Sequence, residues 1–506
     1  MSRWWIWLLA LGVWAGDLSL VVEARLLGST PSGEESISPG TFARRMLGVI
    51  QIILDKHVDP PTRQEMVLAA ARGLARKVGQ PLPARLSHRI SSLDSEAEMG
   101  QLLEELWAEA RSTRKVDDDV LQLAALNAIA LIVPGPAAVL SSAEARVQQQ
   151  LAANRYVGIG VQLAGDDAGQ RVSIVAAFPR GAARKAGARP GDVILEIDGV
   201  QTGGMKLDEV VRLLRGEAGT PVSIMVRQPG AEIRKLEMVR AEIPIESVHG
   251  YRRLGDDTWK FHVDPSQPIA YLRLNSVTAS TLHELREAAR AFEAMEIRGL
   301  ILDLRNDSGS ATLEHFLLLA DELLDVGLIG RTRDGDGNTR EFAARPDCLF
   351  KRLEMAVLVN EYTRGDPEFL AAALQDAGRA SVVGMPTAGD AAIRREFELP
   401  DGLGYITLQV ATWERPSGRA LARPGDGPWT LEPPQAHSSE PLSDQPWGVH
   451  PDTLVKMPED QAKQWAPLRH KFTNPSSDPP PDFPDSQLDE AMRQIREQLS
   501  RERYSR

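Results

Sequence analysis

Residues 179–199 read PRGAARKAGARPGDVILEIDG, and this run decides how the middle of the chain folds. The small residues from Ala182 to Ala186 predict a short helix, and Gly187 after them suits the left-handed conformation that commonly ends a helix. A Pro-Gly-Asp turn follows. The apolar stretch 193–197 then predicts a strand, and the Asp-Gly pair after it is a strong signal for a tight hairpin.

The sequence on either side extends this pattern into a small β-rich unit. Residues 157–161 and 172–176 predict strands, residues 207–214 a second helix, and residues 222–226 a closing strand. This order of elements resembles a PDZ domain over residues 155–230. Such domains bind the C-termini of peptides by adding a strand to the edge of a sheet.

The resemblance places the peptide-binding loop at Gly158, Ile159, Gly160 and Val161. The two glycines let the backbone turn its N–H groups toward a carboxylate. We therefore expect polypeptide C-termini or unfolded protein segments as partners. The alternative is that these glycines only close a turn.

The N-terminus has the features of a secretory signal. Arg3 precedes an apolar run from Trp4 to Gly16, and small residues lie around Ala24. Residues 1–24 are predicted to be a signal peptide, which places the protein in the periplasm or outside the cell. An uncleaved membrane anchor is the alternative. The single cysteine, Cys348, excludes an intrachain disulfide.

Residues 40–154 predict a helical domain ahead of the PDZ-like unit. Apolar residues recur there at three- and four-residue spacing, and the Pro-Gly-Pro at 134–136 ends the last helix. The net charge of -12 argues against nucleic acid as a partner. No spacing of cysteine or histidine typical of a metal site occurs, so we expect neither a metal nor a cofactor.

Strands and helices alternate from residue 240 to residue 455. Buried strands are predicted at 269–274, 299–304, 356–359 and 381–384, with helices at 278–295, 313–324 and 368–377. Such alternation indicates an α/β core in which helices pack on a sheet. A linker and a C-terminal helix are predicted over the remaining residues, 456–506.

This core resembles the tail-specific, or C-terminal-processing, serine peptidase family. Four segments carry the resemblance: 300–306 before the family's Asn-Pro-Gly-Gly turn, 358–360 before its nucleophile loop, 373–384 after that loop, and 416–419 after the last core strands. With the preceding parts, the resemblance spans about residues 40–455. It implies a multi-domain α+β fold with a helical N-terminal domain, a PDZ-like β-rich domain and an α/β peptidase-like core.

The catalytic positions depart from the family's pattern. In that family a serine attacks the peptide bond after a lysine takes its proton. Here Gly365 stands at the serine position, Asp390 at the lysine position, and Arg394 where glutamine is usual. Gly309 remains as an oxyanion-like position in the turn that corresponds to Asn-Pro-Gly-Gly. The sequence therefore predicts a catalytically inactive relative that binds polypeptides through its PDZ domain.

Two alternatives stay open. An active peptidase acting on exported proteins could use a relocated catalytic group, with Thr363 or Ser308 as nucleophile or Asp366 and Asp390 as a carboxylate pair. Each of these residues can instead have a purely structural role. Asp366, for example, lies directly before Pro367 and suits a helix N-cap. The second alternative is a structural role, as a partner subunit of an active peptidase or in self-association, with the helix predicted at 488–499 available for docking.

Overall fold

The computed structural model describes residues 36–423, 447–462, 465 and 484–505, apart from residues 136, 143, 147, 148, 150–155, 166–170, 179, 180, 244, 245, 255–257, 276, 279 and 310. The signal peptide predicted at residues 1–24 and most of the segment predicted as a linker lie outside these residues. Within the part described, no helix is both long enough and apolar enough to span a membrane.

The N-terminal domain is a bundle of the predicted helices. Capping boxes at Thr62 and Ser95 begin two of them, because each hydroxyl accepts an N–H from a glutamate whose carboxylate returns to the cap. Phe42 stacks on the buried Trp107 at the centre of the bundle, with ring centroids 4.3 Å apart. The helices are α2 (Pro39–Lys56), α3 (Arg63–Val78), α4 (Leu86–Ser91), α5 (Glu96–Thr113) and α6 (Asp118–Ile132).

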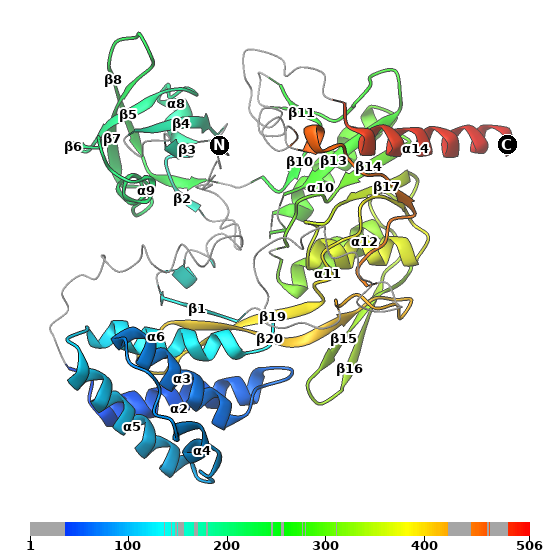
Figure 1. Cartoon of the computed structure of the whole chain (residues 1–506). Helices are drawn as coiled ribbons and strands as arrows, with labels where there is room; N and C mark the ends of the chain where they lie inside the picture. The colour runs from blue at the N-terminus through cyan, green and yellow to red at the C-terminus, as the bar shows by residue number, and fades with distance from the viewer. Residues whose placement is uncertain are drawn as a thin grey trace.

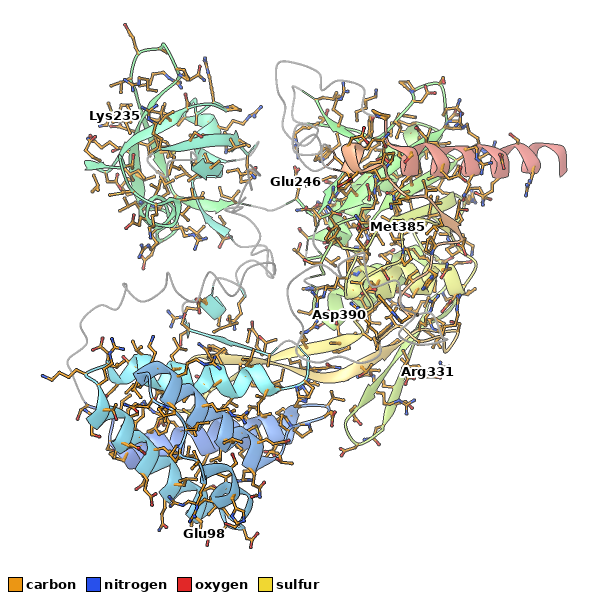
Figure 2. The ribbon with its side chains drawn as sticks, in the orientation of Figure 1. Glu98, Lys235, Glu246, Arg331, Met385 and Asp390 are labelled. Atoms are coloured by element: carbon orange, nitrogen blue, oxygen red, sulfur yellow. The ribbon has the colours of Figure 1, made fainter. Side chains whose placement is uncertain are left out.

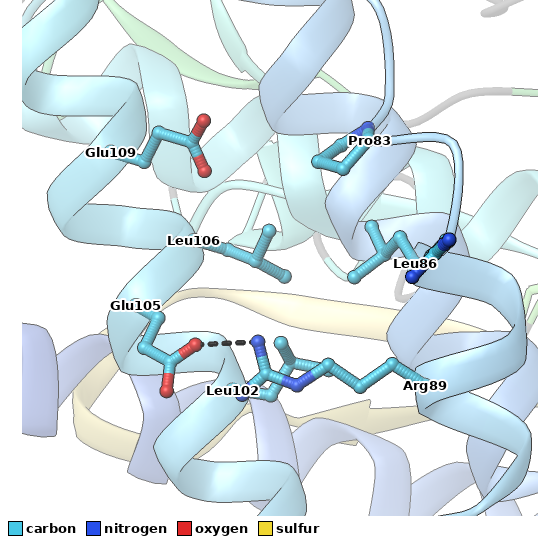
Figure 3. A pocket seen from close by; sticks show the side chains of 8 residues that line it. Pro83, Leu86, Arg89, Leu102, Glu105, Leu106 and Glu109 are labelled. Atoms are coloured by element: carbon cyan, nitrogen blue, oxygen red, sulfur yellow. Dashed lines mark ion pairs between the residues drawn. The ribbon is translucent and has the colours of Figure 1, made fainter.

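A shallow groove lies on this bundle between α4 and α5 (Figure 3). Leu86, Leu102 and Leu106 form its apolar floor, and the ion pair of Arg89 with Glu105, 2.7 Å long, crosses it. The pair is about half exposed on both sides, so water screens most of its attraction.

The PDZ-like part is a separate β-rich unit with its own apolar core. Its sheet has the order β3-β4-β5-β7-β8, with β6 beside β5. The single strand expected at 157–161 is wrong: Gly160 has φ of 75° and divides it into two strands. The elements are β2 (Tyr156–Gly158), β3 (Val161–Gly165), β4 (Val172–Ala177), α8 (Ala182–Lys185), β5 (Val193–Ile197), β6 (Val200–Gln201), α9 (Leu207–Leu214), β7 (Pro221–Arg227), β8 (Arg234–Val239) and β9 (Ala241–Ile243), which pairs with β2.

The third part is a mixed α/β core built on a mainly parallel sheet of order β10-β13-β14-β17-β18-β21. Figure 1 shows α11 and α12 on one side of this sheet and α14 on the other, and each side buries its own apolar cluster. The elements are β10 (Val248–His249), β11 (Arg252–Arg253), β12 (Trp259–Lys260), β13 (Ile269–Leu274), α10 (Thr281–Ala294), β14 (Gly299–Asp303), α11 (Leu313–Leu323), β17 (Glu354–Val359), α12 (Asp366–Asp376), β18 (Ser381–Gly384), β21 (Thr453–Leu454) and α14 (Ser486–Ser505).

A second, antiparallel sheet connects the core to the helical bundle (Figure 1). Its longest strand, β20, pairs with β1 beside the bundle and with β15 beside the core. Leu399, Ile406 and Leu408 therefore belong to the apolar cluster of the bundle, although they lie in the peptidase-like part of the sequence. The strands are β1 (Ala138–Leu140), β15 (Gly327–Asp334), β16 (Thr339–Ala344), β19 (Ala392–Glu398) and β20 (Tyr405–Glu414).

Candidate functional site

The residues at the predicted catalytic positions meet where two neighbouring parallel strands end. The turn after β14 and the turn after β17 lie side by side, because β14 pairs with β17 in parallel and both strands end at the same edge. The backbone N–H of Asn306 donates to the side-chain oxygen of Asn360 at 2.9 Å. The N–H of Arg364 donates to the carbonyl of Asp307, also at 2.9 Å. These bonds hold the two turns together.

Gly365 lies at the sharp bend between the second turn and α12. Its φ of 67° and ψ of -130° are accessible to glycine and strained for other residues. A Cβ built at Gly365 would have only the carbonyl oxygen of Ser308 within 4 Å, at 3.8 Å. The bend thus has room for a side chain at the position predicted for the nucleophile, and the chain places none there.

The expected cap of α12 is displaced by one residue. Gly365 is the N-cap, Asp366 is the first helical residue and Pro367 the second. The N–H of Gly365 donates to Glu368 Oε2 at 3.0 Å, so Glu368 supplies its half of a capping box, while Gly365 has no side chain to accept a helix N–H. The prediction that Asp366 caps the helix was therefore wrong.

Glu368 fastens two loops of the site to each other. Its fully buried carboxylate accepts the N–H of Gly389 at 2.6 Å and of Asp390 at 2.9 Å, in addition to that of Gly365, and the hydroxyl of Thr387 donates to it as well. Burial raises the pKa of Glu368 to about 7, against the effect of these hydrogen bonds. The loop that carries Asp390 is consequently fixed relative to Gly365.

Asp390 lies at the predicted lysine position, at the edge of the core just before β19 (Figure 2). Arg364 Nε donates to its Oδ2 at 2.9 Å, and Arg394 Nη2 donates to both of its carboxylate oxygens at 2.8 Å. Burial opposes ionisation, but Arg394 and Arg364 hold the pKa of Asp390 below its usual range. The structure therefore brings Gly365, Asp390 and Arg394 into one site, where the aspartate at the predicted lysine position is ion-paired.

The backbone N–H groups of Gly309 and Gly365 are both engaged within the chain. The N–H of Gly309 donates to Asp307 Oδ1 at 3.2 Å, and that of Gly365 donates to Glu368. Gly309 has φ of 66°, and a Cβ there would meet Asp366 Oδ1 at 2.2 Å. The position predicted as oxyanion-like is thus a tightly packed turn whose donor already has an acceptor.

The residues proposed for a relocated catalytic group differ in how exposed they are. Thr363 is fully buried; its hydroxyl donates to the carbonyl of Leu304 at 2.9 Å and accepts the N–H of Asn360 at 3.0 Å. Ser308 is exposed on the first turn. Ser310 lies outside the described residues.

The two aspartates expected to form a carboxylate pair have different neighbours. Asp390 is bound by arginines, whereas Asp366 accepts the N–H of Ala311 at 3.4 Å. Burial raises the pKa of Asp366 well above its usual value, and the carboxylate of Asp307 raises it further. Asp307 is the carboxylate that the sequence reasoning missed. Burial raises its pKa to about 7, and the only sequence signal was its place after a buried strand.

A buried ionic cluster also holds the turn that follows β14. Arg305, only 2% exposed, binds Asp303 at 2.7 Å within its own turn and Asp485 at 2.9 Å at the start of α14. Its guanidinium lies 4.6 Å from the ring of Trp465. The C-terminal helix is therefore tied to the site turn by charge as well as by apolar packing. No group of acidic, histidine or cysteine side chains suited to hold a metal ion occurs in the described parts of the chain.

The predicted peptide-binding loop lies between β2 and β3. Ile159 is buried, and its carbonyl accepts the N–H of Ala183 at 2.8 Å; the carbonyl of Gly160 accepts the N–H of Phe178 at 2.8 Å. Val161 begins β3, which among the described strands pairs only with β4. β3 is thus one of the two edge strands of this sheet, with β8 at the other end, and strand addition beside β3 would extend the sheet.

Comparisons with known proteins agree with this architecture. Residues 268–428 match the profile of Peptidase family S41, and residues 174–228 match that of the PDZ domain. The chain is 33% identical over 269 residues to the carboxyl-terminal-processing protease of Synechocystis sp., covering 53% of this chain and 60% of that protein. It is 30% identical over 282 residues to the chloroplastic C-terminal processing peptidase of Tetradesmus obliquus, covering 54% of this chain and 60% of that protein.

A similar match, 27% identical over 295 residues, is found with the carboxy-terminal processing protease CtpB of Bacillus subtilis, covering 57% of this chain and 58% of that protein. The chain thus spans less than two thirds of the length of each of these relatives. The two profiles follow one another along the chain in the order of the β-rich unit and the α/β core. The α/β core is therefore similar to the C-terminal-processing peptidases of family S41, and a PDZ domain lies ahead of it.

Proposed function

We propose that this chain is a catalytically inactive member of its family, which binds polypeptide C-termini or unfolded segments through its PDZ domain. The observation that carries the proposal is the state of the site around Gly365. A serine nucleophile needs a hydroxyl, a neighbouring base and free donors for the oxyanion. Gly365 has no side chain, Asp390 is ion-paired to Arg364 and Arg394, and the backbone N–H groups of Gly309 and Gly365 bond to the chain's own carboxylates.

The alternative, an active peptidase with a relocated group, has less support. The hydroxyl of Thr363 is buried and donates to a backbone carbonyl, so its activation would first require that bond to break. Asp390 is held ionised by two guanidinium groups, which leaves it a weak base. Ser308 has no general base bonded to its hydroxyl in the described hydrogen bonds of the site.

Peptide binding in the proposal rests on the β-rich domain. β3 is a terminal strand of its sheet, to which a peptide strand could be added, and Gly160 keeps the loop between β2 and β3 close to Gly181. We also propose that the chain is exported to the periplasm or out of the cell. This proposal rests on the apolar N-terminal run alone.

The test has two arms that use the mature chain. In the first, the chain is incubated with an unfolded protein and the products are followed by mass spectrometry; we expect no new termini. New termini that increase with the amount of chain and disappear in Thr363→Ala or Asp390→Ala would instead establish a relocated catalytic group. In the second arm, binding of peptides with free C-termini is measured by fluorescence polarisation, with Gly160→Val as the variant that should weaken it.

A further inference from the structure

The last helix of the N-terminal bundle has apolar residues on two sides. One side of α6, which lies at the border of the bundle in Figure 1, packs into it through Leu121, Ala125 and Ile129. The other side carries Leu123 and Leu131, whose exposed fractions are 40% and 59%. A helix that is apolar all round is usually buried all round, so the outer side of α6 is a candidate contact surface.

The exposed residues of α6 form one row along the helix. Leu123, Asn127 and Leu131 follow one another at four-residue spacing, which places them on one side of the helix. Val120 is partly exposed and falls on the same side. We call these four residues the outer stripe. The exposed side of α5 is of the ordinary solvated kind, since it carries Glu104, Glu105 and Glu109.

The central part of the outer stripe reads the same from either end. Leu123 lies four residues before Asn127, and Leu131 lies four residues after it. In an antiparallel pair of α6 helices with two-fold symmetry, Leu123 of one copy would face Leu131 of the second copy. Asn127 would meet its own counterpart on the symmetry axis. Rows of residues spaced by four are also the rows that interdigitate in the commonest class of helix packing.

An asparagine suits the centre of such a pair. The side-chain amide of Asn127 can both donate and accept a hydrogen bond, so two copies can satisfy each other across the axis. A single asparagine within an apolar helix interface is a means of fixing the register of the two helices. An antiparallel arrangement also opposes the two helix dipoles, whereas a parallel one would align them side by side. The row therefore favours an antiparallel pair centred at Asn127.

The charges around α6 favour a second copy over a lipid surface. Helices that lie on a bilayer carry Lys and Arg beside their apolar side, and α6 contains neither. The segment just before it, residues 111–119, balances three basic residues with three acidic ones, so it provides no net positive charge for anionic lipid. No charged residue occurs from residue 120 to residue 133. Pairing two copies of the outer stripe therefore buries no unpaired charge.

From this arrangement we propose that two copies of the chain associate through the outer stripe of α6, antiparallel and about a two-fold axis at Asn127. Because α6 has 15 residues, it is about 22 Å long. A contact through one such helix per copy lies at the low end of stable interfaces, which bury about 1,200–2,000 Å². The dimer should therefore be weak, with a dissociation constant of about 1–100 μM. It would join two PDZ domains and so strengthen binding of a polypeptide that offers two sites.

The first test is the molar mass of the mature chain, measured by light scattering at concentrations from about 1 to about 200 μM. We expect the mass to rise with concentration from that of one copy toward that of two. Leu131→Glu should keep the mass of one copy throughout, because the contact would bury an unpaired charge. The matched control is Leu454→Glu, since Leu454 in β21 is 65% exposed and lies outside the outer stripe. It should associate as the unmodified chain does.

Disulfide cross-linking tests the direction of the helices and the position of the axis. After oxidation, Asn127→Cys should run as a linked dimer on a non-reducing gel. Leu123→Cys alone should not, because its two copies would lie about 12 Å apart along the helices, too far for a disulfide. A mixture of Leu123→Cys with Leu131→Cys should be linked. The unmodified chain measures the background from Cys348, which is buried.

Three results would overturn the proposal: the mass of one copy at every concentration, equal masses for Leu131→Glu and Leu454→Glu, or a disulfide in Leu123→Cys alone. If Leu131→Glu abolishes binding to phosphatidylglycerol vesicles and leaves the mass unchanged, the outer stripe faces a bilayer and the dimer is likewise refuted. The cysteine variants introduce no charge, so cross-linking decides even if Leu131→Glu folds poorly. Neither arm measures peptide binding, so a failure here leaves the proposed function untouched.

Discussion

Replacing Asp390 by asparagine should destabilise the core while keeping its shape. The carboxylate accepts three bonds from arginine, at 2.8–2.9 Å, and one from the N–H of Ala392 at 3.1 Å. Removing one partner of a buried ion pair costs about 3–5 kcal/mol. Because Arg364 and Arg394 remain 21% and 25% exposed and can be solvated, we expect a loss of about 2–3 kcal/mol in the free energy of unfolding.

The assay is urea denaturation of the full chain, followed at the transition of the core. The matched control is Asp401→Asn, because Asp401 also binds two arginines, Arg44 and Arg45, but is 41% exposed and should lose much less. The pKa of Asp390 is lowered in the folded chain, so its stabilisation is present above the ordinary aspartate pKa of about 4 and is lost as the pH falls below it. The chain with Asp390 and the asparagine variant should therefore converge in acid. An equal loss in the two asparagine variants at neutral pH, or a difference that persists in strong acid, would refute the reasoning.

Three further predictions concern the parts around the site. Arg305→Met should lower the free energy of unfolding of the core by about 3–5 kcal/mol, because the buried Asp303 and Asp485 lose the guanidinium that pairs with them. Limited proteolysis should then cleave α14 more readily. Arg493→Met, on the exposed side of α14, should change neither measurement. The raised pKa values of Asp307 and Glu368, both about 7, mean that their stabilising effect is complete below about pH 4 and is lost as the pH rises toward 7. Glu368→Gln should flatten this fall in the urea midpoint, and an unchanged slope would contradict the assignment. Gly160→Val, with the peptidase core left unmodified, should weaken binding of a free-acid peptide to the PDZ domain at least about tenfold, as measured by fluorescence polarisation, and unaltered affinity would exclude this loop from the binding site.

Local sequence patterns were sufficient for most helices and for the buried strands of the core. The capping residues Thr62 and Ser95, with glutamate three positions later, begin helices where the periodicity predicts them. The continuous apolar runs at 269–274 and 299–304 become central strands, buried on both faces. The long antiparallel strands β19 and β20 were not predicted, because their side chains alternate between two environments and one half packs on a helical bundle that is distant in sequence.

The sequence by itself indicated the resemblance to C-terminal-processing peptidases, the order of the three parts, and Gly365 and Asp390 as the residues at the predicted catalytic positions. These follow from residue types and short-range spacing, which need no knowledge of distant contacts. Only the tertiary structure decided the partners of those residues. Arg364 and Arg394 converge on Asp390, Asp307 occupies the N–H of Gly309, and Glu368 occupies that of Gly365. The reason is physical: which charges pair and which donors are satisfied depends on burial and on distances between turns that parallel strands bring to one edge.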